Sequence, residues 1–182
     1  MFKYVSDVSD LSHNIIKNYC RDFNVAVDAT LGNGYDTDFL KKIFSKVYAF
    51  DIQKCATEKY KEKNKCNKNI VIINDSHHKF NEYIAEKVNC FIYNLGYLPG
   101  GDKKITTIAE TTVKSIKYSL ELLSNGGLIT ISIYNGHEQG KKEKNDIFEL
   151  LNNLPKNKYG VLLHTFYNRS ADAPILAVIE KK

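Results

Sequence analysis

The stretch VAVDATLGNGYDTDFL, residues 25–40, decides the fold. Its apolar run, residues 25–29, has the composition of a buried strand, and Asp28 stands near the end of that run. Two glycines then flank an asparagine at residues 32–34, and a helical pattern follows from residue 37 to residue 44. A glycine-rich turn between a strand and a helix is typical of a loop that cradles part of a nucleotide.

The same alternation of strand and helix continues along the chain. Further strands are predicted at residues 47–51, 69–75, 88–94 and 126–134, with helices at 54–65, 106–123 and 141–154. The last two strands, 159–166 and 174–180, have no helix between them and must pair antiparallel. We therefore expect an α/β fold, a Rossmann-like, mostly parallel sheet of about seven strands with a terminal antiparallel pair, covered on both faces.

Length and composition fit one globular unit. The chain has 182 residues, 43% of them hydrophobic and 26% charged, so residues 1–182 are expected to form a single domain. A helix over residues 7–19 belongs to an N-terminal segment, residues 1–22, that packs on this domain. No apolar run reaches the roughly 20 residues that cross a bilayer, and no signal peptide is visible at the start, so a cytoplasmic protein is expected without membrane contact.

Cysteines and charges narrow the possible partners. The 4 cysteines form no CxxC pair and have no histidines at zinc spacing, so no metal site is expected and all four thiols are expected to be reduced. A formal net charge of +5 permits a polyanionic partner such as RNA. The lysine-rich segments 59–69 and 140–146 also contain glutamate and asparagine, which favours solvated helix faces over a dedicated RNA surface.

Polar residues gather where the predicted strands end, which is where doubly wound sheets bind ligands. Asp51 suits hydrogen bonds from both hydroxyls of a ribose, and Asp75 suits the amino group of an adenine. The acid Asp28 disfavours the pyrophosphate of NAD, and Thr37 replaces the third glycine of the dinucleotide fingerprint. An acid in this loop suits S-adenosylmethionine, which has no phosphate and carries an ammonium and a sulfonium.

The fourth strand leads into FIYNLGYLPGGDK, residues 91–103, in which Asn94 and Tyr97 form an Asn-x-x-aromatic pattern. Amino-group methyltransferases have a similar (Asp/Asn)-Pro-Pro-(Tyr/Phe) segment at this point. A nitrogen nucleophile must direct its lone pair at the methyl carbon. The Asn94 side-chain oxygen and the Leu95 carbonyl would accept the amine hydrogens, while Tyr97 would stack on a base or face the cationic centre. The alternative is a strand that merely ends in a Gly-Pro turn.

Several segments together make the chain similar to a known family. The chain resembles the YtqB/MnmM-like class I methyltransferases, which are described as rRNA methylases. The matching segments occur in order and at compatible spacing: DATLGNGYDTDFL (28–40), FDIQ (50–53), INDSHH (73–78), YNLGYLPGGDK (93–103), the threonine pair 111–112, SIYNGHEQGKKEK (132–144) and IEKK (179–182).

The resemblance implies a Rossmann-like enzyme that uses S-adenosylmethionine. It also implies the last methylation of the tRNA wobble uridine, from 5-aminomethyl-2-thiouridine to its 5-methylaminomethyl form. Asn94, Gly96 and Tyr97 would face the methyl group and the amine. The residues expected to bind the cofactor, from the strand ends and from the resemblance together, are Asp28, Gly32, Asn33, Gly34, Asp36, Asp51, Gln53, Asp75, Ser76, His77 and Gly96.

The residues expected to bind the substrate come from three separate segments of the chain. Pro99 and Lys103 lie in the loop after Asn94, where Lys103 would approach the RNA backbone or remain a solvated lysine. His137 follows the fifth strand and would either shape the substrate pocket or order its own loop. Arg169 would contact a phosphate or a base, or be a solvated loop arginine. Members of the family carry His at the position of Tyr35 and a different loop at residues 168–174.

Three further questions stay open at this stage. His77 is the best side-chain candidate for a proton acceptor, although a structural or adenine-side contact is the stronger interpretation. The leading function is methylation of the anticodon arm of tRNA; the alternatives are rRNA or a small amine as acceptor, an NAD-dependent oxidoreductase, or a non-catalytic RNA-binding protein. A homodimer is expected because it would extend the basic surface.

Overall fold

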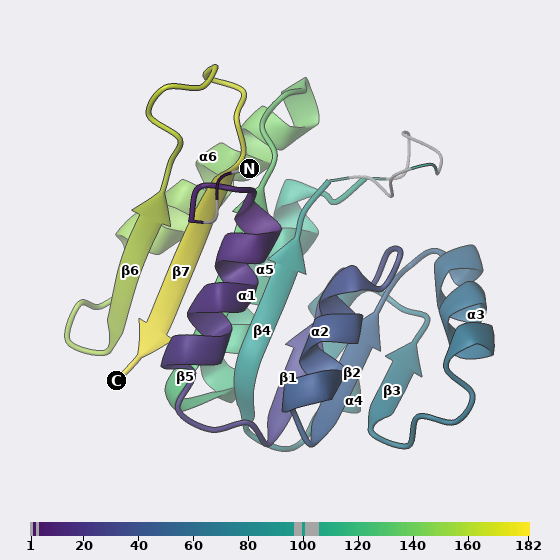
Figure 1. Ribbon diagram of the computed structural model, residues 1–182. Helices are drawn as coiled ribbons and strands as arrows, with labels where there is room; N and C mark the ends of the chain where they lie inside the picture. The colour runs from purple at the N-terminus through teal and green to yellow at the C-terminus, as the bar shows by residue number, and fades with distance from the viewer. Residues whose placement is uncertain (1, 3, 97–99, 101–105) are drawn as a thin grey trace.

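The computed structural model describes residues 2, 4–96, 100 and 106–182. Its strands form one seven-stranded sheet in the order β3-β2-β1-β4-β5-β7-β6 (Figure 1). β1 to β5 are mutually parallel, while β7 runs antiparallel between β5 and β6. The strands are β1 (Val25–Asp28), β2 (Lys46–Phe50), β3 (Ile70–Ile73), β4 (Val88–Asn94), β5 (Leu123–Ile133), β6 (Tyr159–His164) and β7 (Ile175–Lys181). This arrangement confirms the predicted seven-stranded sheet with its terminal antiparallel pair.

Helices cover both faces of the sheet. Figure 1 shows α1, α2 and α3 on the near face and α4, α5 and α6 behind it. A single 3₁₀ turn, η1 (His77–Lys79), leads into α4. The helices are α1 (Val8–Tyr19), α2 (Tyr35–Ile43), α3 (Lys54–Lys63), α4 (Phe80–Tyr83), α5 (Ala109–Leu122) and α6 (Glu138–Asn152). Among the described residues, no helix has the length and apolar character needed to cross a membrane.

The alternation of side chains along each strand feeds two hydrophobic cores. In β2, Phe50 contacts the core behind the sheet, where its ring packs edge-on against Phe80 at a centroid distance of 4.8 Å. Val47 lies on the other face, in the core that contains Ile16 of α1 and Leu40 of α2. All five of these side chains are fully or nearly fully buried, as expected for a parallel sheet covered on both faces.

Element boundaries differ from the sequence prediction in instructive places. β5 begins at Leu123, three residues before the predicted start, because the chain already pairs there with Val88. The glycine pair at residues 126–127 therefore lies inside the strand, at a register shift, rather than before it. α6 also begins early, at Glu138, because His137 caps its N-terminus through a hydrogen bond from the Gly140 amide.

The strand order creates the crevice in which a ligand would bind. β1 and β4 are neighbours, but the chain after β1 leads to α2 on one face and the chain after β4 leads toward α5 on the other. Such a reversal opens a crevice outside the carboxyl ends of the two strands. The glycine-rich loop after β1 and the Asn94 segment after β4 therefore meet at this edge.

Candidate functional site

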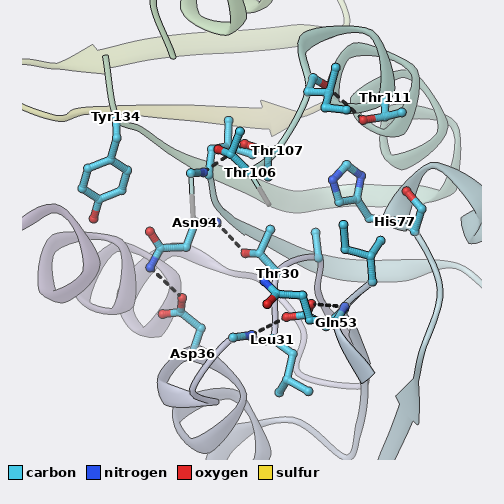
Figure 2. A pocket seen from close by; sticks show the side chains of 18 of the residues that line it. Thr30, Leu31, Asp36, Gln53, His77, Asn94, Thr106, Thr107, Thr111 and Tyr134 are labelled. Atoms are coloured by element: carbon cyan, nitrogen blue, oxygen red, sulfur yellow. Dashed lines mark hydrogen bonds between the residues drawn. The ribbon is translucent and has the colours of Figure 1, made fainter. Parts of the chain in front are cut away.

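A cavity of about 930 Å³ lies over the carboxyl ends of the parallel strands. Its walls come from the loop after β1, the turn between β2 and α3, the turn before η1, the end of β4 and the turn after β5 (Figure 2). Asp172, in the loop between β6 and β7, also lines it. Segments far apart in sequence thus converge on one hollow, as expected at a switch point of an α/β sheet.

The acid at the end of β1 does not face this cavity. Asp28 is fully buried and accepts hydrogen bonds from the Thr30 amide at 3.0 Å and the Thr37 hydroxyl at 2.5 Å. Burial, reinforced by the nearby Asp36 carboxylate, raises the pKa of Asp28 well above its usual range. The expectation that Asp28 lines the ligand site is corrected: its carboxylate lies inside the protein and orders the loop.

Gly34 is also absent from the cavity lining, where a cofactor contact was expected. It precedes α2 with φ +83°, a left-handed conformation that favours glycine. A Cβ atom there would lie 2.2 Å from the Tyr60 ring. Its role in the structure is therefore to let the loop turn tightly against α3.

Asp51, directly after β2, lies in the wall of the cavity. One carboxylate oxygen accepts the Gly32 amide and the other the Gln53 amide, both at 2.8 Å. Burial raises the pKa of Asp51, and the two amide donors oppose that shift. A carboxylate offers about four acceptor sites, so two remain for a pair of hydroxyl groups. Gly32, Asn33 and Gln53, also expected to bind the cofactor, line the cavity beside it.

The turn after β3 brings three predicted residues, Asp75, Ser76 and His77, to the cavity. The Asp75 carboxylate is already engaged, because it accepts hydrogen bonds from Lys79 at 3.0 Å and from Tyr83 at 2.8 Å. The Ser76 amide donates to its other oxygen at 2.7 Å. Asp75 therefore holds the turn together and has less capacity left for a ligand than its position at the strand end indicated.

His77 is buried in the cavity wall, with its ring edge-on to Tyr93 at 5.9 Å. Burial and the neighbouring His78 lower the pKa of His77 to about 4, so the ring is neutral near pH 7. Within the described part of the chain, His77 Nδ1 has no hydrogen-bond partner, and the same holds for Thr106 Oγ1. Both residues line the cavity, and because buried polar atoms are normally paired, the two unpartnered atoms indicate a polar ligand.

Asn94 ends β4 and is fixed at three points. The backbone N–H of Asn94 donates to Thr30 Oγ1 at 2.8 Å. The side-chain Nδ2 donates to Asp36 at 3.2 Å and to Ser9 at 3.5 Å. Asp36 in turn accepts a hydrogen bond from His13 Nε2 at 2.6 Å. Because a carboxylate only accepts, the side-chain nitrogen of Asn94 must face Asp36. Figure 2 shows the Asn94 oxygen turned away from Asp36, on the side of Tyr134.

The segment after Asn94 is anchored where the structure describes it. Leu95 donates its amide to Ser132 at 3.0 Å, and Gly96 donates its amide to the Thr107 hydroxyl at 2.9 Å. That hydroxyl donates to the buried Glu143 carboxylate at 2.8 Å. Leu95 and Gly96 line the cavity, where the predicted contacts with the amine and the cofactor would be made. Tyr97, Pro99 and Lys103 lie outside the described residues.

The two remaining substrate-side predictions have different outcomes. His137 lines the cavity and also caps α6, since its Nδ1 accepts the Gly140 amide at 3.0 Å. Arg169 is not part of the lining, and an RNA contact by this residue outside the cavity stays a prediction. Its guanidinium lies 3.6 Å from the Phe166 ring centroid and donates to the Val5 and Ser6 carbonyls, so it ties the N-terminal segment to the β6–β7 loop.

The sequence did not single out several residues at or beside the site, among them Tyr134, Thr30 and His13. Tyr134 follows β5 at the same sheet edge, and Thr30 follows Asp28, so both carry the strand-end signal already applied to their neighbours. His13 carried no such signal, because it lies in α1 and meets Asp36 only through the packing of α1 on α2. Within the described ranges, no group of three or more His, Cys, Asp or Glu side chains is arranged to hold a metal ion.

This arrangement combines a carboxylate ready for hydroxyl groups with an oriented amide oxygen ready for a donor. The chain was compared with protein families, sequences and solved structures. A family model described as "Putative rRNA methylase" matches residues 47–180. A tRNA (mnm5s2U34)-methyltransferase from Arabidopsis thaliana, named as chloroplastic, is 31% identical to this chain. The alignment, 194 positions long, covers 96% of this chain and 69% of that protein.

Two crystal structures superpose on nearly the whole chain. A protein from Clostridium thermocellum, described as a "putative rRNA-methylase", has a TM-score of 0.92 at 36% identity, covering 98% of this chain and 99% of that one. A protein from Streptococcus mutans, described as "a putative methyltransferase" and crystallised in complex with SAH, has a TM-score of 0.89 at 37% identity with the same coverage. The fold, the match over residues 47–180 and the identity to these relatives together establish that the chain belongs to the rRNA methylase family of class I methyltransferases.

Proposed function

We propose that this protein is an S-adenosylmethionine-dependent N-methyltransferase. Its proposed acceptor is the exocyclic amine of 5-aminomethyl-(2-thio)uridine at the tRNA wobble position, and its product is the 5-methylaminomethyl form. The observation that carries the proposal is Asn94, whose side-chain nitrogen is held by Asp36 so that its oxygen is presented as an acceptor at the cavity. An amine is the substrate that such an oxygen would orient.

The residues present fit the methyl donor. Asp51 retains acceptor capacity for two ribose hydroxyls, and the loop at Gly32 approaches the cavity without a side chain. The unpartnered atoms His77 Nδ1 and Thr106 Oγ1 would gain partners on the nucleoside. Bound S-adenosylmethionine supplies an electrophilic methyl carbon on sulfur; transfer forms a carbon–nitrogen bond, breaks the carbon–sulfur bond and leaves a surplus proton on the nitrogen.

The protein's own contribution is orientation and exclusion of water. Asn94 Oδ1 and the Leu95 carbonyl would accept the two amine hydrogens and thereby direct the nitrogen lone pair. An alkyl ammonium has a pKa of about 10 by analogy with lysine, and only the neutral amine attacks. The cavity would favour the neutral form, because burial in a less polar environment penalises the charged one.

His77 does not suit the role of general base. With a pKa lowered to about 4, it holds a proton far less well than the amine does near pH 7. The amine proton would therefore pass to water before transfer, and His77 would contact the nucleoside instead. This favours the structural or cofactor-side interpretation of His77 over the catalytic one.

The relatives support both halves of the proposal. The Streptococcus mutans protein was crystallised with SAH, the product that remains after methyl transfer, and it is 37% identical to this chain. The Arabidopsis relative is named for tRNA mnm5s2U34. The family description instead names rRNA, so rRNA is the acceptor to test against tRNA.

The acceptor is tested with labelled S-adenosylmethionine and two RNA preparations, bulk tRNA and rRNA, from cells that lack this gene. After digestion, the labelled nucleoside is identified by mass spectrometry. The proposal predicts label on 5-methylaminomethyl-2-thiouridine in the tRNA and none in rRNA. Label on an rRNA nucleoside, or on a tRNA nucleoside without an aminomethyl group, would contradict the proposed acceptor while leaving the methyltransferase intact.

A further inference from the structure

We infer that His13 is a positioning residue that acts through Asp36 to hold the Asn94 side chain in its amine-accepting orientation. The inference rests on the proposed function, since it concerns the group that would receive the acceptor amine. His13, Asp36 and Asn94 come from α1, α2 and β4, respectively. Their alignment is therefore a product of tertiary packing rather than of a local motif.

One carboxylate joins the three side chains. His13 Nε2 lies 2.6 Å from Asp36 Oδ1, and Asn94 Nδ2 lies 3.2 Å from Asp36 Oδ2. The His13 contact is the shorter of the two, in the range of a charge-assisted hydrogen bond. The Asp36 side chain is only 7% exposed, so few water molecules can replace a lost donor. His13 thus supplies the principal hydrogen bond that fixes the plane of the carboxylate.

The imidazole ring is itself held in place. It stacks on Phe39 at a centroid distance of 3.9 Å with an interplanar angle of 7°. Phe39 and Asp36 lie three residues apart on α2, so they occupy the same face of that helix. His13 therefore makes two contacts that can be tested separately: the stack on Phe39, which orients the ring, and the hydrogen bond from Nε2 to Asp36.

The orientation matters because the two ends of an amide are opposite in character. A rotation of the Asn94 side-chain amide by half a turn would place an N–H group where the acceptor amine must donate, and the contact would become repulsive. Asp36 excludes this rotamer only while its own carboxylate stays in position. Asp36 is near enough to Asp28 for its charge to contribute to the raised pKa of Asp28. With a second acid nearby, an Asp36 side chain that loses its His13 donor is expected to change position.

Two substitutions separate the hydrogen bond from the stack. His13→Gln keeps an N–H donor at about the position of Nε2 but removes the ring, whereas His13→Phe keeps a ring for Phe39 but removes the donor. The expected single-turnover rate of methyl transfer is within about 3-fold of wild type for H13Q and lower by roughly 10- to 100-fold for H13F. The affinity for S-adenosylmethionine should change by less than about 2-fold in both, because His13 is not in the cavity lining. His164→Gln, at the far edge strand, is the matched control and should behave as wild type.

A second readout does not depend on the acceptor. The side-chain amide resonances of Asn94 are assigned in a ¹H–¹⁵N spectrum by their loss in Asn94→Asp. They should keep their wild-type positions in H13Q and move toward the values of solvent-exposed amides in H13F. Unchanged Asn94 resonances in H13F, or an unchanged transfer rate, would overturn the inference. A wild-type protein that methylates neither RNA would contradict the proposed function, and the Asn94 spectrum would then decide the His13 inference by itself.

Discussion

His77 and Asp28 show how burial sets the charge of single residues at this site. Burial lowers the pKa of the His77 imidazole and raises that of the Asp28 carboxyl, since in both cases the neutral form is favoured. Both were expected to bind the cofactor, Asp28 from its strand end and His77 from the family resemblance. The sequence could not predict that Thr30 and Thr37 would draw the Asp28 carboxylate inward. Nor could it link His13 to Asp36, because that contact arises from helix packing.

The lowered pKa of His77 predicts a pH-dependent stability. Between about 6.5 and about 4 the unfolded chain binds a proton at His77 that the folded protein does not, so folding stability falls as the pH falls. On acidification from about pH 7 to about pH 5, the free energy of unfolding should fall by about 2 kcal/mol less in His77→Gln than in wild type. Urea unfolding of wild type and His77→Gln at the two pH values measures it.

The comparison is made as a difference between the two proteins because Asp28 titrates with the opposite sign. Its raised pKa in the folded state adds stability at low pH that is lost as the pH rises. That contribution is present in both proteins and cancels in the difference. Equal losses of stability on acidification in wild type and His77→Gln would contradict the buried, neutral His77.

At the scale of elements, the turn from β1 into α2 was the best-predicted part of the molecule. The glycines and the helix-forming pattern after them were read correctly, although α2 begins at Tyr35, two residues before the predicted start. The sequence did not reveal that Gly34 is packed against Tyr60 of α3. Residue propensities locate the turn at Gly34, but they do not show that Tyr60, 26 positions later in the chain, packs against it.

This packing predicts an unequal response to alanine at two glycines. Gly34→Ala would combine a strained φ of +83° with a Cβ only 2.2 Å from the Tyr60 ring, and should destabilise the protein by about 2 kcal/mol or more. Gly160→Ala, in β6 with open space around the added Cβ, should change stability by less than about 0.5 kcal/mol. Urea denaturation of both variants tests the contrast, and similar midpoints would refute it.

The link between α6 and the end of β4 makes a second prediction at this scale. The Thr107 hydroxyl donates to Glu143 and accepts the Gly96 amide, so Thr107→Val would leave both groups with one partner fewer. Because Glu143 is 3% exposed, water cannot easily replace the lost donor, and the expected cost is about 1–3 kcal/mol.

Thermal unfolding of Thr107→Val and of a control variant, Thr165→Val, measures this cost. Thr165 is exposed and lies outside the cavity lining, so its replacement reports the effect of a threonine-to-valine change alone. The control should remain within about 0.5 kcal/mol of wild type. If Thr107→Val were equally stable, the hydrogen-bond link from α6 to Gly96 would not contribute to holding this segment.

At the scale of the whole molecule, the alternation of strands and helices was sufficient to predict the fold class and the terminal antiparallel pair. Periodicity could not show that β7 lies between β5 and β6, or that β1 and β4 are neighbours, since strand order is set by long-range packing. The site followed from a general rule that ligands bind at the carboxyl edge of such sheets. That rule points to Asp51, Asn94 and their neighbours, which line the cavity, whereas the contacts of Arg169 with the N-terminal segment carry no signal in the sequence.

The whole arrangement predicts that donor binding and methyl transfer can be separated at one residue. Asn94 borders the cavity on the β4 side, whereas Asp51 and Gly32 lie on the side assigned to the nucleoside. Asn94→Ala would therefore leave most donor contacts in place while removing the oxygen that orients the amine. The expected loss is about 100-fold or more in the transfer step, typical of misplacing a reacting group.

The decisive measurement is the single-turnover rate of methyl transfer to tRNA from cells lacking this gene, for wild type and Asn94→Ala, with S-adenosylmethionine affinity measured calorimetrically on the same samples. The expected result is an affinity within about 3-fold of wild type together with a transfer rate lower by about 100-fold or more. Equal transfer rates in the two proteins would contradict the role assigned to Asn94, and a wild-type protein that does not bind S-adenosylmethionine would contradict the assignment of the cavity itself.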